Sequence, residues 1–242
     1  MPTRLVNVVV DAVDPLALAR FWADLLGWRV AEADGGEVDV SAPPEDGWDM
    51  DLVFVPVPEA KNGKNRVHLD LSSLSPTDQD ATVRRALSLG ATRIDIGQGD
   101  VPWVVLADPV GNEFCVLEPR PEYADTGAVA AIVVDANDPG AQATFWAAAT
   151  DWRIVRDDPA YASLHRMDHH GPWLEFLRTD TSKPPKNRIH LDVAAHPGED
   201  QHAEVARLRA LGATPADVGQ HNAPWTVLRD PEHNEFCVLT SR

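Results

Sequence analysis

Hydrophobic residues near the start of the chain follow two different spacings. The segment Val6 to Val10 is mainly β-branched, which predicts a short buried strand. Asp14 followed by Pro15 supplies a helix N-cap and a first-turn proline. Apolar residues then recur at intervals of three and four before Gly27, which predicts a helix with one buried face formed by Leu18, Phe21, Trp22 and Leu25.

The same alternation of strand and helix patterns continues to the middle of the chain. Three strands are predicted around Trp28 to Ala31, Glu37 to Val40 and Asp51 to Val55. A second strand, helix and three strands follow, at Arg66 to Leu71, about Thr77 to Leu89, and near Ile94, Val104 and Cys115. The order βαβββ therefore occurs twice within about 120 residues.

The whole pattern then repeats in the second half of the chain. VVVDAVDPLALARFW from Val8 returns as IVVDANDPGAQATFW from Ile132, and PWVVLADPVGNEFCVL from Pro102 returns as PWTVLRDPEHNEFCVL from Pro224. The copies meet at EPRPEYADTG, which shows neither the hydrophobic spacing of a helix nor that of a strand. We predict two α+β domains, residues 1–120 and 126–242, joined by a linker at 118–127.

These motifs together resemble one known superfamily. Paired βαβββ units, DPLALARFWADLLGW near the start, a strand with His in the middle, and the closing DPVGNEF are similar to the vicinal oxygen chelate superfamily of glyoxalases, bleomycin-resistance proteins and extradiol dioxygenases. The resemblance implies that the two βαβββ modules of each copy curl into a half-barrel sheet with helices outside. In that family the concave side holds a divalent metal, with ligands on the first and last strands of each module.

The implied ligand positions are depleted in this sequence. They fall on Asn7, Val53, His68 and Cys115 in the first copy, and on Ala131, Glu175, His190 and Cys237 in the second. Asn7, His68 and Cys115 include no carboxylate, so no metal is expected in the first copy. Glu175, His190 and Cys237 have the ligand types of a zinc site. We expect no cofactor, with a divalent metal (Zn, Fe, Mn or Ni) in the second copy as the alternative.

Other side chains are candidates for lining a ligand cleft. Strand alternation places Asp70 on the face of His68, and Asp192 on the face of His190. Four tryptophans near strands can stack a planar ligand or simply pack in the core: Trp48, Trp103, Trp173 and Trp225. Buried structural roles for both histidines and both cysteines remain open alternatives.

The composition of the chain limits the classes of partner that are expected. The formal net charge of −17 disfavours nucleic acid and anionic membranes as partners. The sequence shows no signal-like N-terminal segment and no apolar run near the roughly 18 residues that span a bilayer, so a cytoplasmic protein is expected. No GxSxG elbow, phosphate loop or dinucleotide fingerprint occurs.

Three functions are compatible with these observations. The first is a protein that binds a small aromatic or cationic molecule in a cleft walled by tryptophan, as the resemblance to bleomycin-resistance proteins implies. The second is a metal-dependent lyase, isomerase or dioxygenase that works from the second copy, with Glu175 as a ligand and a candidate general base. The third is an interaction scaffold without a specific ligand. Either a monomer or a homodimer is expected, because duplication can supply within one chain the module pairing that relatives form across a dimer.

Overall fold

The computed structural model describes residues 2–32, 34–168, 170–220 and 223–241. The first copy comprises β1 (Arg4–Ala12), α1 (Pro15–Leu26), β2 (Arg29–Glu32), β3 (Val38–Ser41) and β4 (Asp51–Pro56) as module 1. Module 2 comprises β5 (Val67–Leu71), α2 (Pro76–Ser88), β6 (Thr92–Arg93), β7 (Val104–Ala107) and β8 (Glu113–Val116). Short 3-10 turns lie at Asp34–Gly36 and, in the linker, at Pro121–Tyr123.

The second copy repeats this order. Module 3 comprises β9 (Val129–Ala136), α3 (Pro139–Thr150), β10 (Arg153–Asp157), β11 (Tyr161–His165) and β12 (Trp173–Arg178). Module 4 comprises β13 (Ile189–Ala194), α4 (Gln201–Ala210), β14 (Thr214–Pro215), β15 (Thr226–Arg229) and β16 (Glu235–Leu239). The α+β class and the tandem repeat of paired βαβββ modules are confirmed. No described helix is long and apolar enough to cross a membrane.

Local chemistry fixes the ends of the first helix in each copy. The Asp14 carboxylate accepts a hydrogen bond from the backbone N–H of Ala17 at 3.0 Å, and Pro15 occupies the first turn. Gly27 ends α1 in the left-handed conformation, at φ 75°. Asp151 takes that role after α3, at φ 63°, and is one of two described non-glycine residues with positive φ.

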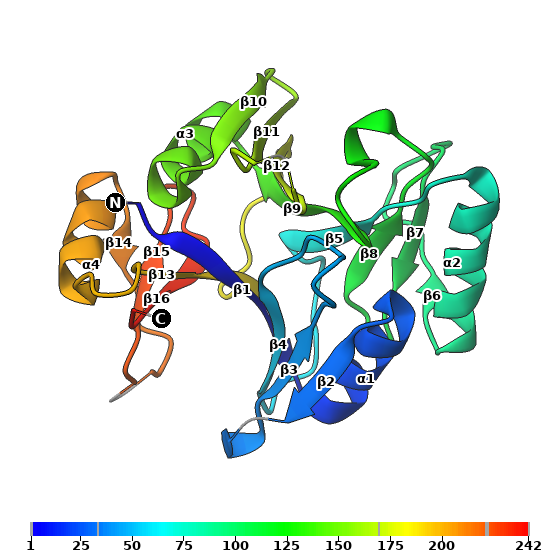
Figure 1. Cartoon of the computed structure of the whole chain (residues 1–242), viewed down its shortest axis with the longest axis horizontal. Coiled ribbons are helices and arrows are strands. Elements are labelled where there is room, and N and C mark those ends of the chain that lie inside the picture. Colours follow the sequence, from blue (N-terminus) through cyan, green and yellow to red (C-terminus); the bar gives the residue numbers. More distant parts are fainter. Residues whose placement is uncertain (1, 33, 169, 221–222, 242) are drawn as a thin grey trace.

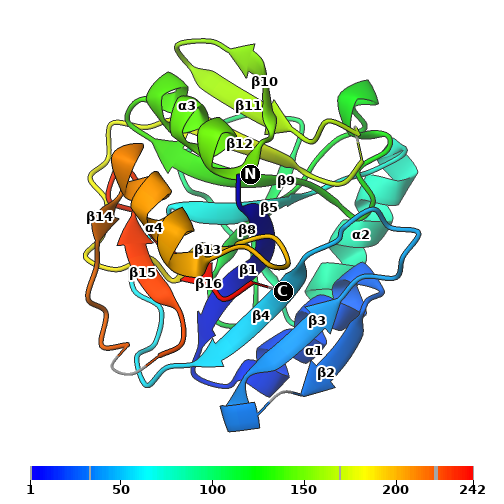
Figure 2. The ribbon, with the colours of Figure 1, turned by 60° about the vertical axis from the view of Figure 1, so that its left-hand side comes forward.

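The four modules pair across the copies to form two eight-stranded sheets (Figure 1). Sheet A has the order β14-β15-β16-β13-β1-β4-β3-β2 and joins modules 1 and 4. Sheet B has the order β10-β11-β12-β9-β5-β8-β7-β6 and joins modules 2 and 3. The expectation that each copy curls its own two modules into one sheet is therefore corrected. The reason is that β1 pairs antiparallel with β13, and β5 with β9, so the central seam of each sheet joins opposite copies (Figure 2).

One large hydrophobic core lies behind both sheets. Along β1, Val8, Val10 and Ala12 belong to this core, whereas Asn7, Val9 and Asp11 face the other way and line a cleft. The predicted helix face of Leu18, Phe21, Trp22 and Leu25 is buried in the same core.

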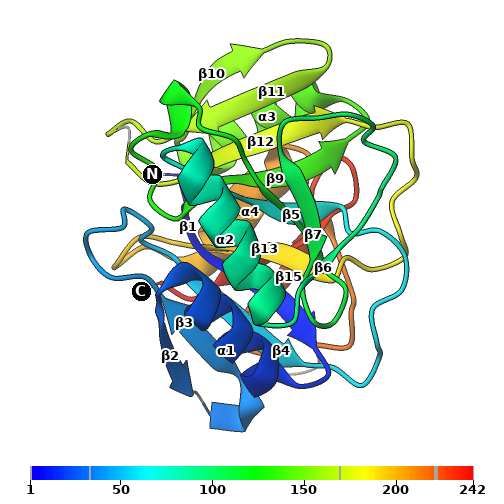
Figure 3. The same cartoon turned by 90° about the vertical axis from the view of Figure 1, so that its right-hand side faces the viewer.

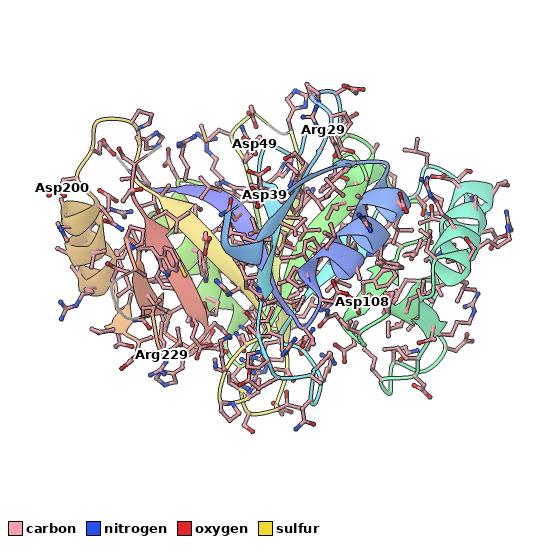
Figure 4. The ribbon with its side chains drawn as sticks, turned by 90° about the horizontal axis from the view of Figure 1, so that it is seen from below. Arg29, Asp39, Asp49, Asp108, Asp200 and Arg229 are labelled. Atoms are coloured by element: carbon pink, nitrogen blue, oxygen red, sulfur yellow. The ribbon has the colours of Figure 1, made fainter. Side chains whose placement is uncertain are left out.

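Modules of the same copy contact each other through helices and turns. The Trp22 indole Nε1 donates to Asp108 Oδ2 at 3.3 Å, and Figure 4 shows Asp108 beside α1. The other Asp108 oxygen accepts from the backbone of Val110 and Asn112, which closes the turn between β7 and β8. Trp146 and Asp230 repeat the bond at 3.3 Å in the second copy. Figure 3 shows α1 and α2 of the first copy side by side. In the second copy, Arg207 of α4 donates to the carbonyl oxygens of Ala148 and Ala149 in α3. The helices thus link the modules within a copy, while each sheet joins the two copies.

Candidate functional site

An open cleft of about 650 Å³, called cleft A here, lies over the central strands of sheet A. Its floor is formed by residues of β1, β4, β13 and β16, namely Asn7, Val9, Val53, His190, Asp192 and Cys237. Trp225, Val227 and Leu239 add apolar surface from one side. Trp225 is 40% exposed, as a side chain at the rim of a cleft should be. Cleft A therefore combines a polar patch on its floor with apolar walls and with further charged groups, among them Asp11, Lys186 and Glu235.

The polar patch of cleft A is a chain of short contacts. Asn7 Nδ2 donates to Asp192 Oδ2 at 3.0 Å, which couples the first strand of copy one to copy two. His190 Nε2 lies 3.5 Å from Asp192 Oδ1 and 3.6 Å from Cys237 Sγ. Asp192 is buried, and its Oδ1 has no hydrogen-bond partner within the described part of the chain. A buried carboxylate oxygen without a donor costs free energy.

The cysteines of both clefts are protonated thiols in the absence of a metal. Burial raises the pKa of Cys237, and the neighbouring Asp192 carboxylate raises it further. Burial and Asp70 raise the pKa of Cys115 in the same way. Neither thiol is therefore a ready nucleophile.

Sheet B carries the second set of candidate residues on the face that corresponds to the floor of cleft A. This face is packed with buried side chains and is called cleft B here by analogy. His68 Nε2 lies 3.4 Å from Asp70 Oδ1, and Cys115 lies beside Asp70 in the neighbouring strand. Glu175 comes from β12, next to Val133, which in turn lies opposite His68. Trp103, Trp173 and Cys115 belong to one apolar cluster on this face.

The linker between the copies occupies cleft B. Tyr123 of the linker is buried, and its hydroxyl donates to Glu175 Oε1 at 3.0 Å. Its ring meets Trp173 edge-on with a centroid separation of 6.1 Å. Sequence reasoning missed Tyr123. The signal for it was topological, since a linker from β8 to β9 must cross β5, which lies between them in sheet B.

Two sequence-based predictions about the site are corrected. Glu175 does not join His190 and Cys237, because β12 belongs to sheet B whereas β13 and β16 belong to sheet A. Trp48 lines neither cleft: it is 4% exposed and packs on Trp28 in the main core, with ring centroids 5.2 Å apart. The remaining candidates divide between the clefts, with Asn7, His190, Asp192, Trp225 and Cys237 in cleft A and His68, Asp70, Trp103, Cys115, Trp173 and Glu175 in cleft B.

The fit of a metal to cleft A can be judged from its donor atoms. His190, Asp192 and Cys237 each offer one donor, and these atoms lie within 4.8 Å of one another. Tetrahedral zinc with bonds of about 2.0–2.3 Å separates neighbouring donors by about 3.3–3.6 Å. The two separations from His190, 3.5 and 3.6 Å, agree with that geometry. The residues present therefore fit zinc with an open fourth position, although Asp192 replaces the Glu175 that the sequence had suggested.

Comparison with known proteins agrees with the repeat and the fold. The family model of the glyoxalase-like domain matches residues 7–117 and again residues 131–239. Glyoxalase I from Zea mays superimposes with a TM-score of 0.65 at 15% identity, over 98% of this chain and 92% of that chain. A mutant of the Zea mays enzyme gives 0.66 at 16% identity, over 99% and 94%.

A third structure matches about half of the chain. A glyoxalase/bleomycin resistance protein from Albidiferax ferrireducens covers 48% of this chain and 98% of its own, at 22% identity and a TM-score of 0.36. No curated protein matches the chain in sequence. At such low identities the structural likeness shows the fold alone.

Proposed function

We propose that this chain, which belongs to the family of glyoxalase-like domains, binds a small molecule in cleft A. In this proposal Asp192 receives a cationic or hydrogen-donating group, while an apolar part of the ligand lies against Val9, Val53 and Trp225. The observation that carries the proposal is the buried, unpartnered Asp192 Oδ1 at the floor of an open cleft. A volume of about 650 Å³ lies in the range typical of ligand pockets, roughly 300–1,000 Å³.

The charges around cleft A favour a cationic ligand. Lys186 pairs with Asp11, and Lys183 binds Glu235 at 2.8 Å, so those carboxylates are already neutralised. Among the described residues, Asp192 has no lysine or arginine partner. The basic side chain in contact with Asp192 is that of His190, whose Nε2 lies 3.5 Å from Asp192 Oδ1. A protonated amine would supply both the missing charge and the missing hydrogen bond.

A pair of aromatic probes of opposite charge tests this proposal. 1-Naphthylmethylamine is expected to bind, and 1-naphthoate at least about tenfold more weakly, by isothermal titration calorimetry. Asp192→Asn should weaken amine binding about tenfold or more, because a hydrogen bond to a charged group contributes about 1.5–3 kcal/mol. Asp70→Asn alters the equivalent residue of cleft B and should leave amine affinity unchanged. Equal binding of both probes, or equal loss in the two variants, would contradict the proposal.

A metal-dependent reaction in cleft A is the second candidate function. The donor separations around His190 support it, because they match tetrahedral zinc coordination. His190, Asp192 and Cys237 would hold the ion, and the Cys237 thiol would lose its proton on binding. A zinc ion at this place would supply a Lewis acid for a substrate oxygen. The chain's part in such a reaction is to hold the ion at the floor of the cleft, with Trp225 at the rim to position the substrate.

Metal titration decides between the two candidates. Protein purified without chelator or tag metal is titrated with Co²⁺, and thiolate coordination is followed by the near-ultraviolet charge-transfer absorption. If the metal candidate holds for cleft A, about one equivalent binds, Cys237→Ser abolishes the band, and Cys115→Ser retains it, because Cys115 belongs to sheet B. If no Co²⁺ or Zn²⁺ binds, the metal candidate is wrong and the metal-free binding protein remains.

A further inference from the structure

The side chain of Tyr123 is held in cleft B by directional contacts of three kinds. Its hydroxyl donates to Glu175 Oε1 at 3.0 Å, and its ring meets Trp173 at an interplanar angle of 84°. The Arg120 guanidinium lies 5.8 Å from the Tyr123 ring and 5.6 Å from the ring of Trp103. A linker side chain that only filled space would need none of this polar complementarity.

The groups around Tyr123 resemble the lining of a ligand site more than a core. In the same region lie His68, Asp70 and Cys115, the counterparts of the polar patch in cleft A. Asp70 is buried, and its Oδ1 has no hydrogen-bond partner in the part of the chain that is described. The Trp173 indole Nε1 is also buried without a partner there. Unsatisfied polar atoms of this kind are uncommon in cores and are typical of places where a ligand supplies the partner.

We propose that cleft B is a second binding site, specific for a phenol, and that Tyr123 of the linker occupies it as an internal ligand. The linker, residues 118–127, is then called the strap. A free phenol can displace its Tyr123 side chain from cleft B. The inference concerns the opposite sheet from cleft A and does not depend on the function proposed there.

The contacts of Tyr123 identify the class of ligand. Glu175 provides an acceptor for a hydroxyl proton, Trp173 provides an edge-to-face aromatic contact, and Arg120 provides a cation against a ring face. A neutral hydroxyl group suits Glu175, because burial raises the pKa of this carboxyl group to about 7. The hydrogen bond from Tyr123 lowers that pKa, and the Asp70 carboxylate raises it. An aliphatic alcohol lacks the ring, and toluene lacks the hydroxyl.

Complementation of a cavity variant tests the proposal. Tyr123→Ala removes the internal ligand, and 4-methylphenol, which has the same ring and hydroxyl, is offered in its place. Calorimetry should detect binding of 4-methylphenol to the variant at least about tenfold more strongly than to the unaltered chain, and about tenfold more strongly than toluene binds to the variant. A folded Tyr123→Ala variant that binds neither compound, or binds both equally, overturns the inference.

Two further variants locate the bound phenol. Glu175→Val in the Tyr123→Ala background gives cleft B the residue that Val53 provides in cleft A, and it should abolish the preference for 4-methylphenol over toluene. Trp225→Ala in the same background alters only cleft A and should leave phenol affinity unchanged. If Trp225→Ala removes the binding instead, the phenol lies in cleft A and the inference is wrong.

A measurement on the unaltered chain covers the case in which Tyr123→Ala does not fold. Hydrogen exchange of the amides in residues 118–127 is followed with and without saturating 4-methylphenol, with toluene as the control. Displacement of the strap should speed the exchange severalfold with the phenol and not with toluene. Unchanged exchange at saturating phenol contradicts the proposal.

Discussion

At the scale of single residues, burial decides the chemistry of the acidic groups. Glu175 is 8% exposed, and its pKa of about 7 follows chiefly from desolvation of the charged form. The groups that face it act in opposite directions, since the Tyr123 hydroxyl and Arg120 favour the carboxylate while Asp70 opposes it. Desolvation outweighs the favourable partners, so the folded protein holds the proton of Glu175 more tightly than an unfolded chain does.

This shift predicts how stability depends on pH. With a folded pKa of about 7 against an ordinary 4.5, ionisation of Glu175 makes folding less favourable as pH rises from 4.5 to 7, by at most about 3 kcal/mol. Glu175→Gln cannot ionise and keeps an acceptor for Tyr123. The variant should therefore match the unaltered chain at pH 4.5 and exceed it in the free energy of unfolding at pH 8. Urea denaturation at both pH values measures this.

A surface residue of the linker serves as the control for that prediction. Glu122 is exposed, so Glu122→Gln should give nearly the same free energy of unfolding as the unaltered chain at pH 8. An equal effect of the two substitutions would show that total charge, rather than burial at Glu175, sets the pH dependence.

At the scale of elements, the linker is anchored where it enters β9, at the C-terminal end of its path over cleft B. Thr126 Oγ1 donates to the carbonyl of Tyr123, and the backbone N–H of Ala128 donates to Asp46 Oδ2 at 3.1 Å. Asp46 also accepts from Trp28 Nε1 at 3.3 Å, which joins the linker to module 1. Gly127 makes this approach possible, because a Cβ there would overlap the backbone oxygen of Asp46.

Two glycine substitutions distinguish the free-energy cost of crowding at this close approach from the cost of a left-handed backbone conformation. Gly127 and Gly198 both have positive φ, 77° and 84°, but a Cβ at Gly198 would meet nothing within 4 Å. Gly198→Ala should lower the free energy of unfolding by about 1–2 kcal/mol, the cost of the left-handed conformation. Gly127→Ala should lower it by at least about 2 kcal/mol more, because Asp46 must move. Equal losses in urea denaturation would mean that the linker adjusts freely.

At the scale of the whole molecule, the exchange of modules ties the copies together. The pairings of β1 with β13 and of β5 with β9 both cross between copies. Ion pairs cross as well, between Lys186 and Asp11, between Lys64 and Asp135, and between Arg66 and Glu232. Each sheet is complete only when both copies are present, and so is each cleft.

This topology predicts that neither copy is a folded monomer. Residues 1–120 alone leave β1 and β5 without their cross-copy partners, and exposed strand edges associate. Light scattering and circular dichroism should find the separate fragments unfolded or self-associated, and an equimolar mixture with 126–242 should restore a folded one-to-one complex. A folded, monomeric fragment 1–120 would contradict the prediction.

The sequence by itself determined the elements, the duplication and the chemical character of the candidate residues. These are local properties: β-branched runs, the Asp14 and Pro15 cap, Gly27 and the repeated His-x-Asp strands are written in adjacent residues. Only the tertiary structure decided which modules pair in each sheet. Periodicity identifies the apolar face of each strand but not the module that lies beside it, so it cannot choose between the two ways of pairing the modules. For that reason Glu175 was grouped with His190 by sequence and separated from it by the fold. The role of Tyr123 was hidden for the same reason, since a linker's neighbours depend on the path it takes between strands.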